Sequence, residues 1–210
     1  MTLAGEIRTL LAGQEPLSRL SALDELAYVV ATSVISPSGR LTVRGNTGRA
    51  RVLADAQDNG GLAWSPDGGT IAFQATDGWL ALVGADGTGL RETPHRGNDP
   101  AWSPDGTRIA FARGAATAVL DLSSGFARDV GPTATSLGVH VTGVYPGAVW
   151  SPDSTRLAIQ LHNGVEVVRS DGTGRELWIS GTGVPAWSPN GSELAYGRRG
   201  ALIVRSLTSS

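Results

Sequence analysis

Cysteine and lysine are both absent from this chain of 210 residues. Without cysteine the chain can form no disulfide, no thiolate metal site and no cysteine nucleophile. Without lysine it has no Schiff-base or phosphate-loop lysine, and all 17 basic residues are arginine. These two absences exclude several classes of enzyme and metalloprotein before any motif is considered.

The chain also lacks long apolar runs and a strong net charge. No apolar run approaches the length of about 20 residues that spans a bilayer. The first 13 residues do not have the basic and apolar segments of a secretory signal. A formal net charge of −2 favours neither nucleic acid nor an anionic membrane as a partner. We therefore expect no nucleic-acid binding and no membrane insertion. The compartment stays open: the chain as written is cytoplasmic, and a processed or excised domain would be periplasmic or extracellular.

A motif of Trp-Ser-Pro followed by Asp or Asn occurs four times, with its tryptophans spaced 38, 48 and 37 residues apart. Each copy leads into an apolar triplet such as IAF or LAY and then into a second apolar run. The tryptophans are Trp64, Trp102, Trp150 and Trp187, and the turn residues are Asp67, Asp105, Asp153 and Asn190. Four short strands in about 40 residues are typical of a β-propeller blade.

Each member of this motif has a predicted structural role. The tryptophan is expected to fill the wedge between neighbouring blades, where its large apolar surface is buried. Proline fixes its own φ angle at the second position of the turn. Aspartate forms hydrogen bonds with the turn backbone, and glycine accepts a positive φ. Because Asn190 replaces aspartate in one copy, the pattern favours turn chemistry over a ring of metal-binding or catalytic carboxylates.

The stretch AWSPDG at residues 101–106, with IAF after it and DGTG in other copies, resembles the TolB-type propeller repeat, the WD-like repeat of bacterial proteins. The resemblance covers residues 60–205 strongly and the N-terminal part weakly. It implies a propeller fold and a binding module rather than an enzyme. The family's six-bladed members have a signal peptide and an extra N-terminal domain. This chain departs from them on all three points, so their role in the cell envelope does not carry over.

The last repeat lacks an outer strand, and the N-terminus is expected to supply it. Residues 5–13 (GEIRTLLAG) align with residues 174–181 (GRELWISG), which predicts a strand over residues 6–11, with an amphipathic helix as the alternative. The sequence thus predicts an all-β fold, a five-bladed β-propeller of four-stranded antiparallel blades whose last blade is closed by the N-terminal strand. A fragment of a larger propeller is the competing interpretation. The predicted single domain spans 1–210, with blades at 14–54, 60–95, 98–130, 146–180, and 183–208 plus 5–11.

The loops between the outer strand of one blade and the inner strand of the next are the predicted binding face, because they gather at one mouth of the channel on a rigid scaffold. One such loop carries His95, Arg96, Asn98 and Asp99, and the next, which is longer, carries His140 and Tyr145. We expect a non-enzymatic, monomeric scaffold that recognises a protein or peptide and needs no cofactor or metal.

Two alternatives stay open. Five-bladed propellers include glycoside hydrolases, which need two carboxylates facing each other across a cavity. Asp99 is the one acidic residue at the start of an inner strand, and Asp58 and Glu15 are its candidate partners. No G-x-S-x-G elbow and no paired metal-ligand motif occurs. The second alternative is a structural propeller module of a larger sensor or envelope protein.

Overall fold

The structure is a computed structural model, and it describes residues 25–31, 38–45, 50–57, 60–132, 147–161, 164–180, 182–198 and 200–207. Within these ranges all regular structure is β-strand, arranged in five antiparallel sheets that follow one another along the chain. No helix in the described part is long and apolar enough to cross a membrane. The expectation of an all-β fold is confirmed.

The sheets contain three or four strands each. The first sheet holds β1 (Glu25–Ala31), β2 (Ser38–Gly45) and β3 (Ala50–Gln57). The second holds β4 (Leu62–Trp64), β5 (Thr70–Gln74), β6 (Trp79–Gly84) and β7 (Arg91–Arg96). The third holds β8 (Asn98–Trp102), β9 (Arg108–Arg113), β10 (Ala116–Asp121) and β11 (Ala127–Pro132). The fourth holds β12 (Ala148–Trp150), β13 (Arg156–Leu161), β14 (Gly164–Arg169) and β15 (Arg175–Ser180). The last holds β16 (Thr182–Trp187), β17 (Glu193–Arg198) and β18 (Ala201–Ser206).

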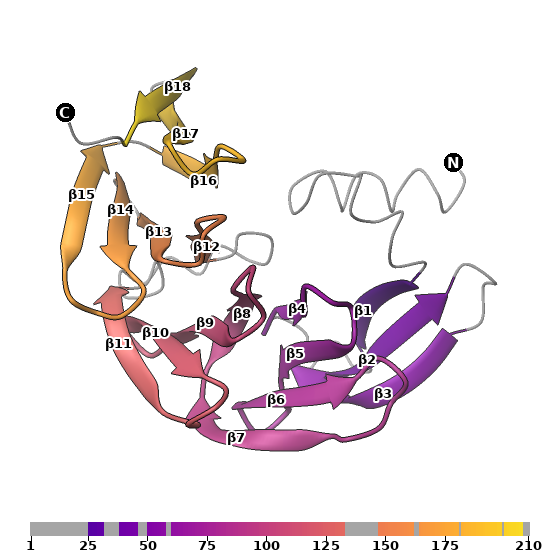
Figure 1. The fold of residues 1–210 in the computed structure, drawn as a ribbon. Coiled ribbons are helices and arrows are strands. Elements are labelled where there is room, and N and C mark those ends of the chain that lie inside the picture. Colours follow the sequence, from indigo (N-terminus) through magenta and orange to yellow (C-terminus); the bar gives the residue numbers. More distant parts are fainter. Residues whose placement is uncertain are drawn as a thin grey trace, which may run out of the picture.

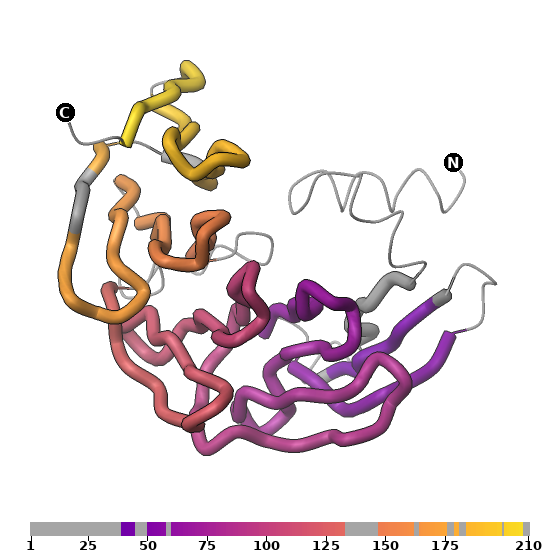
Figure 2. The backbone as a smooth tube through the Cα atoms, viewed as in Figure 1, coloured from indigo at the N-terminus to yellow at the C-terminus, as the bar shows by residue number. Residues whose placement is uncertain are grey.

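The five sheets follow an arc in chain order (Figure 1). The first strands of the later sheets, β4, β8, β12 and β16, lie on the inner side of the arc, and each contacts the next. The described strands do not form a closed ring (Figure 2). Residues 6–11, predicted to close the last blade, and the predicted inner strand of the first blade lie outside the described residues.

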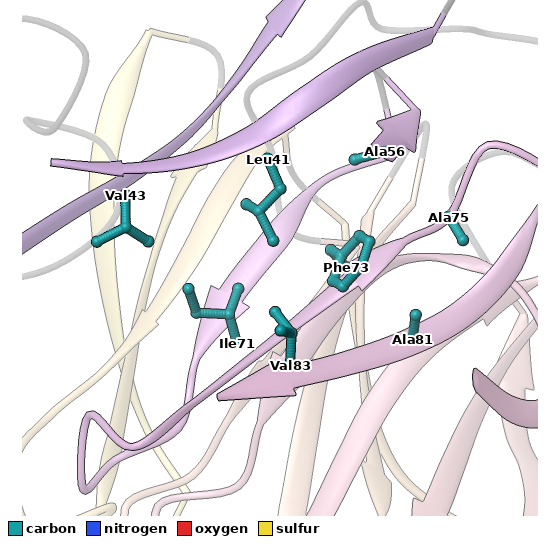
Figure 3. Packing of buried hydrophobic residues seen from close by; sticks show 8 residues of the cluster. All are labelled: Leu41, Val43, Ala56, Ile71, Phe73, Ala75, Ala81 and Val83. Carbon is teal, nitrogen blue, oxygen red and sulfur yellow. The ribbon is translucent and has the colours of Figure 1, made fainter. Parts of the chain in front are cut away.

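The core lies between sheets, because both faces of each central strand carry apolar side chains. Leu41 and Val43 of β2 pack against Ile71 and Phe73 of β5 in the next sheet (Figure 3). Each of the next three junctions has an equivalent apolar cluster. Burial of both faces explains why the triplets are apolar throughout instead of alternating with polar residues.

The turn after each tryptophan reverses the chain within a few residues. In the second sheet the Ser65 amide donates to the Thr70 carbonyl and the Gly68 amide to the Ser65 carbonyl. Gly68 has a φ of 72°, a value that glycine accepts without steric cost. Ser154 takes the equivalent position in the fourth sheet, with a φ of 61°. Its buried hydroxyl oxygen accepts a hydrogen bond from the Asp105 amide of the preceding sheet.

Candidate functional site at the start of strand β8

Asp99 stands at a backbone position that belongs to glycine in the preceding repeat. The stretch DPAW at the start of β8 aligns with GLAW at the start of β4, so Asp99 corresponds to Gly61. The φ angles are 50° for Asp99 and 69° for Gly61. A residue with a side chain is uncommon in this left-handed region, although aspartate tolerates it better than most. A strained position of this kind is a reason to look for function.

The partly buried Asp99 carboxyl lies close to Gly61 of the preceding sheet. The Asp99 amide donates to the Gly60 carbonyl at 2.8 Å, which holds the start of β8 against the segment leading into β4. Its Oδ2 accepts a hydrogen bond from Asn98 Nδ2 at 2.9 Å. No described cation forms an ion pair with it, so nothing offsets the loss of water around the charge. Burial therefore raises the pKa of Asp99 to about 6.

An arginine and a tryptophan form a platform a few residues from Asp99. The Arg96 guanidinium lies 4.4 Å from the centroid of the Trp79 ring, and its Nη1 donates to the Asp77 carbonyl at 2.5 Å. The Gly97 amide donates to the Gly78 carbonyl, which joins this platform to the loop that leads into Asp99. Arg96 is exposed and Trp79 half-buried, so both can meet a ligand from solvent.

Of the remaining predicted binding residues, the structure describes only His95, and it makes its contacts elsewhere. His95 Nε2 lies 2.9 Å from the Gly125 carbonyl oxygen, and its ring contacts Phe111 at a centroid distance of 6.2 Å. The histidine thus bridges two sheets through structural contacts. His140 and Tyr145, on the long loop, lie outside the described residues. So do Asp58 and Glu15, the candidate carboxylate partners of Asp99.

Glu166 on β14 is a second buried carboxyl that the sequence did not single out. It stands opposite Ile159, where the second and third sheets have Ala81 and Ala118. Its Oε1 accepts a charge-assisted hydrogen bond from Arg175 Nε, while Oε2 has no partner. Burial raises the pKa of Glu166, and the arginine opposes this. Because Glu166 lies on the third strand of its sheet, it belongs to a junction between sheets and not to the inner strands.

The repeated tryptophans form a hydrogen-bonded series along the inner strands. Each indole donates to the carbonyl of the residue before the preceding tryptophan: Trp102 to Ala63 at 3.1 Å, Trp150 to Ala101 at 2.9 Å and Trp187 to Val149 at 3.0 Å. Trp64, the first of the four, packs beside the core between the first two sheets. The sequence suggested burial of these rings but gave no indication of this bond.

An arginine guanidinium from the preceding sheet lies over two of these rings, those of Trp150 and Trp187. The Arg108 guanidinium lies 5.2 Å from the Trp150 ring centroid, and that of Arg156 lies 4.9 Å from the Trp187 centroid. Both arginines stand six residues after the tryptophan of their own repeat. The six-residue spacing was visible in the sequence, but only the structure shows that each arginine contacts the tryptophan of the following repeat.

The recurring aspartate-type residues bond within their own turns. Asp67, Asp105 and Asp153 each accept from the motif serine and from the amide two residues later, and Asn190 does the same. Desolvation raises the pKa of Asp105, but hydrogen bonds from Ser103, Thr107 and Arg108 outweigh it and hold this pKa below its usual range. Among the described residues, no group of three metal-ligating side chains occurs.

Comparison with known proteins gives similarity in structure only. No family model and no curated protein matches the sequence. A solved structure of an oligogalacturonate lyase in complex with manganese has a TM-score of 0.57 and 15% identity, covering 80% of this chain and 54% of that one. A hydrazine synthase from Kuenenia stuttgartiensis has a TM-score of 0.51 and 18% identity, covering 72% of this chain and 47% of that one. The chain thus spans about half the length of each neighbour. Both have propeller-type folds, which supports a β-propeller-like all-β fold for this chain.

One expectation is corrected by this comparison. The sequence led us to expect a non-enzymatic scaffold for a protein or peptide, on the basis of a family resemblance that no family model supports. A solved structure of this fold is instead a lyase. The prediction was wrong because a repeat motif specifies a scaffold, whereas function depends on the loops and individual residues that the scaffold carries.

Proposed function

We propose that the protein is a carbohydrate-active β-propeller in which Asp99 transfers a proton. The observation that carries the proposal is the Asp99 carboxyl, held at a glycine-type backbone position and desolvated. Strain and desolvation are both unfavourable to the fold, and active sites are where proteins retain them. One of the two structural neighbours reported above is an oligogalacturonate lyase, which supports a sugar chain as the substrate class.

A pKa of about 6 suits proton transfer near neutral pH. Above this pH the Asp99 carboxylate can accept a proton from the sugar, and below it the neutral acid can donate one to a glycosidic oxygen. Elimination needs the first step, and hydrolysis uses both an acid and a base. The two reactions leave different products, because elimination creates a carbon–carbon double bond in the sugar and hydrolysis does not.

The Trp79–Arg96 platform favours an acidic sugar over a neutral one. An aromatic face can pack against the apolar face of a sugar ring, and a guanidinium can bond a carboxylate through two parallel hydrogen bonds. Because Arg96 precedes Asp99 by only three residues in the chain, a uronate-containing chain is the substrate we expect. Neutral chains would lose the contact with Arg96 and retain the contact with Trp79.

The experiment is an assay of purified protein with two panels of polysaccharides, one neutral and one rich in uronates. New chain ends and unsaturated products are both measured. The variants are Asp99→Asn and, as a matched control, Asp67→Asn, which recreates the asparagine that the last repeat already has at Asn190. Cleavage of a uronate chain by wild type and by the control, but not by Asp99→Asn, supports the proposal. Cleavage that survives in Asp99→Asn contradicts it.

We also propose a five-bladed, TolB-like ring as the architecture that carries this site, with the whole chain as one monomeric domain. The support is that both terminal sheets have three described strands and the three between them have four. Among the described strands the first sheet has no inner strand and the last no outer one, and we propose that residues 14–24 and 6–11 supply them. A closed ring would place the start of β8 at the mouth of a central channel.

A further inference from the structure

Gln74, the last residue of β5, is a polar side chain to which the proposed reaction gives no role. It pairs with Leu80 of β6, and Leu80 belongs to the apolar cluster that the second sheet shares with the third. Residues that pair across an antiparallel sheet have their side chains on the same face. The Gln74 side chain therefore lies on the face toward the third sheet, which carries Asp99. The residues that follow the apolar triplets in the four repeats are Gln74, Ala112, Gln160 and Gly197.

Two glycines show where the ends of the Gln74 carboxamide lie. Gly60 has no room for a side chain, because a Cβ atom there would collide with Gln74 Oε1. A Cβ atom at Gly78 would lie 3.9 Å from Gln74 Nε2 and 3.3 Å from Arg96 Nη1. The carboxamide nitrogen and the Arg96 guanidinium thus approach the same glycine, and the two groups are near neighbours.

The oxygen end of the carboxamide lies toward Asp99. Gly60, which Gln74 Oε1 contacts, accepts a hydrogen bond from the Asp99 amide at 2.8 Å through its carbonyl. The next residue is equally close to the carboxyl, because a Cβ atom at Gly61 would lie 2.9 Å from Asp99 Oδ1. Gln74 thus contacts one glycine of the pair and the Asp99 carboxyl lies against the other. The carboxamide connects the Arg96 side of the site with the Asp99 side.

The Gln74 carboxamide has both its donor and its acceptor available. Within the described part of the chain neither its oxygen nor its nitrogen has a hydrogen-bond partner, whereas the nearby Gln57 Nε2 donates to the Thr76 carbonyl. Gln74 is half-buried, and its polar atoms are not sealed from solvent as Gln160 Oε1 is. A carboxamide presents a donor beside an acceptor, and this suits the hydroxyl groups of a sugar, each of which donates and accepts.

We propose that Gln74 is a substrate-binding residue whose carboxamide hydrogen-bonds sugar hydroxyls, while Arg96 binds the sugar carboxylate and Asp99 transfers the proton. This inference rests on the proposed function and extends it to the recognition of the ring hydroxyls. Neutral and acidic sugars share these hydroxyls, whereas the carboxylate belongs to the acidic sugars alone. Gln74 and Arg96 therefore recognise different parts of one substrate, and their contributions to affinity should separate.

The test measures the binding of an oligogalacturonate and of its methyl ester by calorimetry, in the Asp99→Asn protein so that cleavage does not interfere. Gln74→Met keeps the length of the side chain and replaces the carboxamide by a thioether. Gln160→Met is the matched control at the equivalent position of the fourth sheet. The proposal predicts that Gln74→Met weakens the binding of both ligands about 10-fold or more and that Gln160→Met leaves both affinities unchanged. Arg96→Gln should weaken the binding of the acid and have much less effect on the ester.

A second variant separates sugar contact from a structural role of Gln74. Gln74→Glu keeps an acceptor, loses the donor and adds a negative charge, so it should weaken the binding of the acid more than that of the ester. Urea melts of all variants measure the fold alongside the affinity. Equal affinities in Gln74→Met and Gln160→Met would overturn the proposal, and so would a loss of affinity that only follows a loss of folded protein.

The outcomes also separate this inference from the proposed reaction. If Asp99→Asn abolishes cleavage but Gln74→Met binds as the control does, the reaction stands and the role of Gln74 is overturned. If cleavage survives in Asp99→Asn while Gln74→Met loses affinity, the reaction is contradicted and Gln74 is supported as a sugar-binding residue. With Asp99 intact, Gln74→Met should raise KM by the same factor and leave kcat nearly unchanged. An oligogalacturonate that does not bind at all overturns both.

Discussion

Asp99 combines three properties at the start of strand β8: a positive φ, partial burial and a raised pKa. The nearest polar side chain, Asn98, gives its carboxylate one hydrogen bond. Gly61 fills the equivalent position at no steric cost in the preceding repeat. An aspartate at this position therefore lowers the stability of the fold, which is expected of a residue retained for chemistry.

The raised pKa of Asp99 predicts a pH-dependent stability. The folded protein binds this proton more tightly than the unfolded chain does, so the contribution of Asp99 is most favourable below about pH 4. It is lost as the pH rises through the folded pKa of about 6. Asp99→Asn should therefore be more stable than wild type by about 1–3 kcal/mol at neutral pH, and nearly equal to it below pH 4. Urea melts at both pH values measure this, and a difference that does not change with pH would argue against the shift.

At the scale of the element, the inner strands are held together by the indole series. Each bond spans from one sheet to the carbonyl of the preceding one, so the tryptophan joins neighbouring sheets as well as filling space. The turn that follows fixes the strand end through the motif serine and aspartate. Packing between sheets and local turn chemistry thus make separable contributions to stability.

Replacement of Trp150 by phenylalanine separates the hydrogen bond from most of the packing. The ring stays apolar, but the Ala101 carbonyl loses its indole donor, and this should cost about 1–2 kcal/mol. Trp79→Phe is the control, because no hydrogen bond from the Trp79 indole is found in the described part of the chain. Thermal or urea unfolding of both variants measures the difference. Equal losses in the two would show that the bond contributes nothing beyond ring size.

The turn aspartate should tolerate an amide better than a methyl group. Asp105 Oδ1 accepts from Ser103 and from both the amide and the hydroxyl of Thr107. Asn190 makes the equivalent bonds through its amide oxygen. Asp105→Asn should cost less than about 0.5 kcal/mol and Asp105→Ala about 1–2 kcal/mol, as measured by urea melts. Similar costs for both would mean that the charge, through Arg108, matters more than the turn.

The strands and turns were predictable because their signals are local. The apolar triplets and the Ser-Pro-Asp-Gly turns lie within a few residues of one another, and the all-β prediction drawn from them is confirmed. The indole bonds and the arginine stacking join residues of different repeats, so no local pattern reveals them. Asp99 was visible as the acidic residue at the start of an inner strand, but its strain and its pKa depend on the adjacent sheet.

On the scale of the whole molecule, the described sheets build an arc in chain order, and the proposed ring would join its two ends. Leu202 and Val204 of β18 are exposed in the last sheet, and among the described residues no sheet precedes the first. Closure of the ring would give every sheet two neighbours. It would also bring the loops at the starts of the inner strands around one channel mouth, where ligands of rigid β scaffolds commonly bind.

Deletion of residues 1–13 tests the predicted outer strand. If residues 6–11 pair with β18, their loss exposes an unpaired strand edge. The truncated protein should then show a lower urea midpoint and a tendency to associate, as seen by size exclusion. A truncated monomer with an unchanged midpoint would contradict strand pairing by this segment.

The most direct test of the central claim is a pH–rate profile of sugar-chain cleavage for wild type and Asp99→Asn, on a uronate chain. The account predicts that the wild-type rate changes around an apparent pKa near 6 and that Asp99→Asn loses at least about 100-fold at the pH where the wild-type rate is highest. Asp67→Asn should keep the wild-type profile. An Asp99→Asn protein that folds and retains the wild-type rate and profile would contradict the role of Asp99, and with it the proposed function.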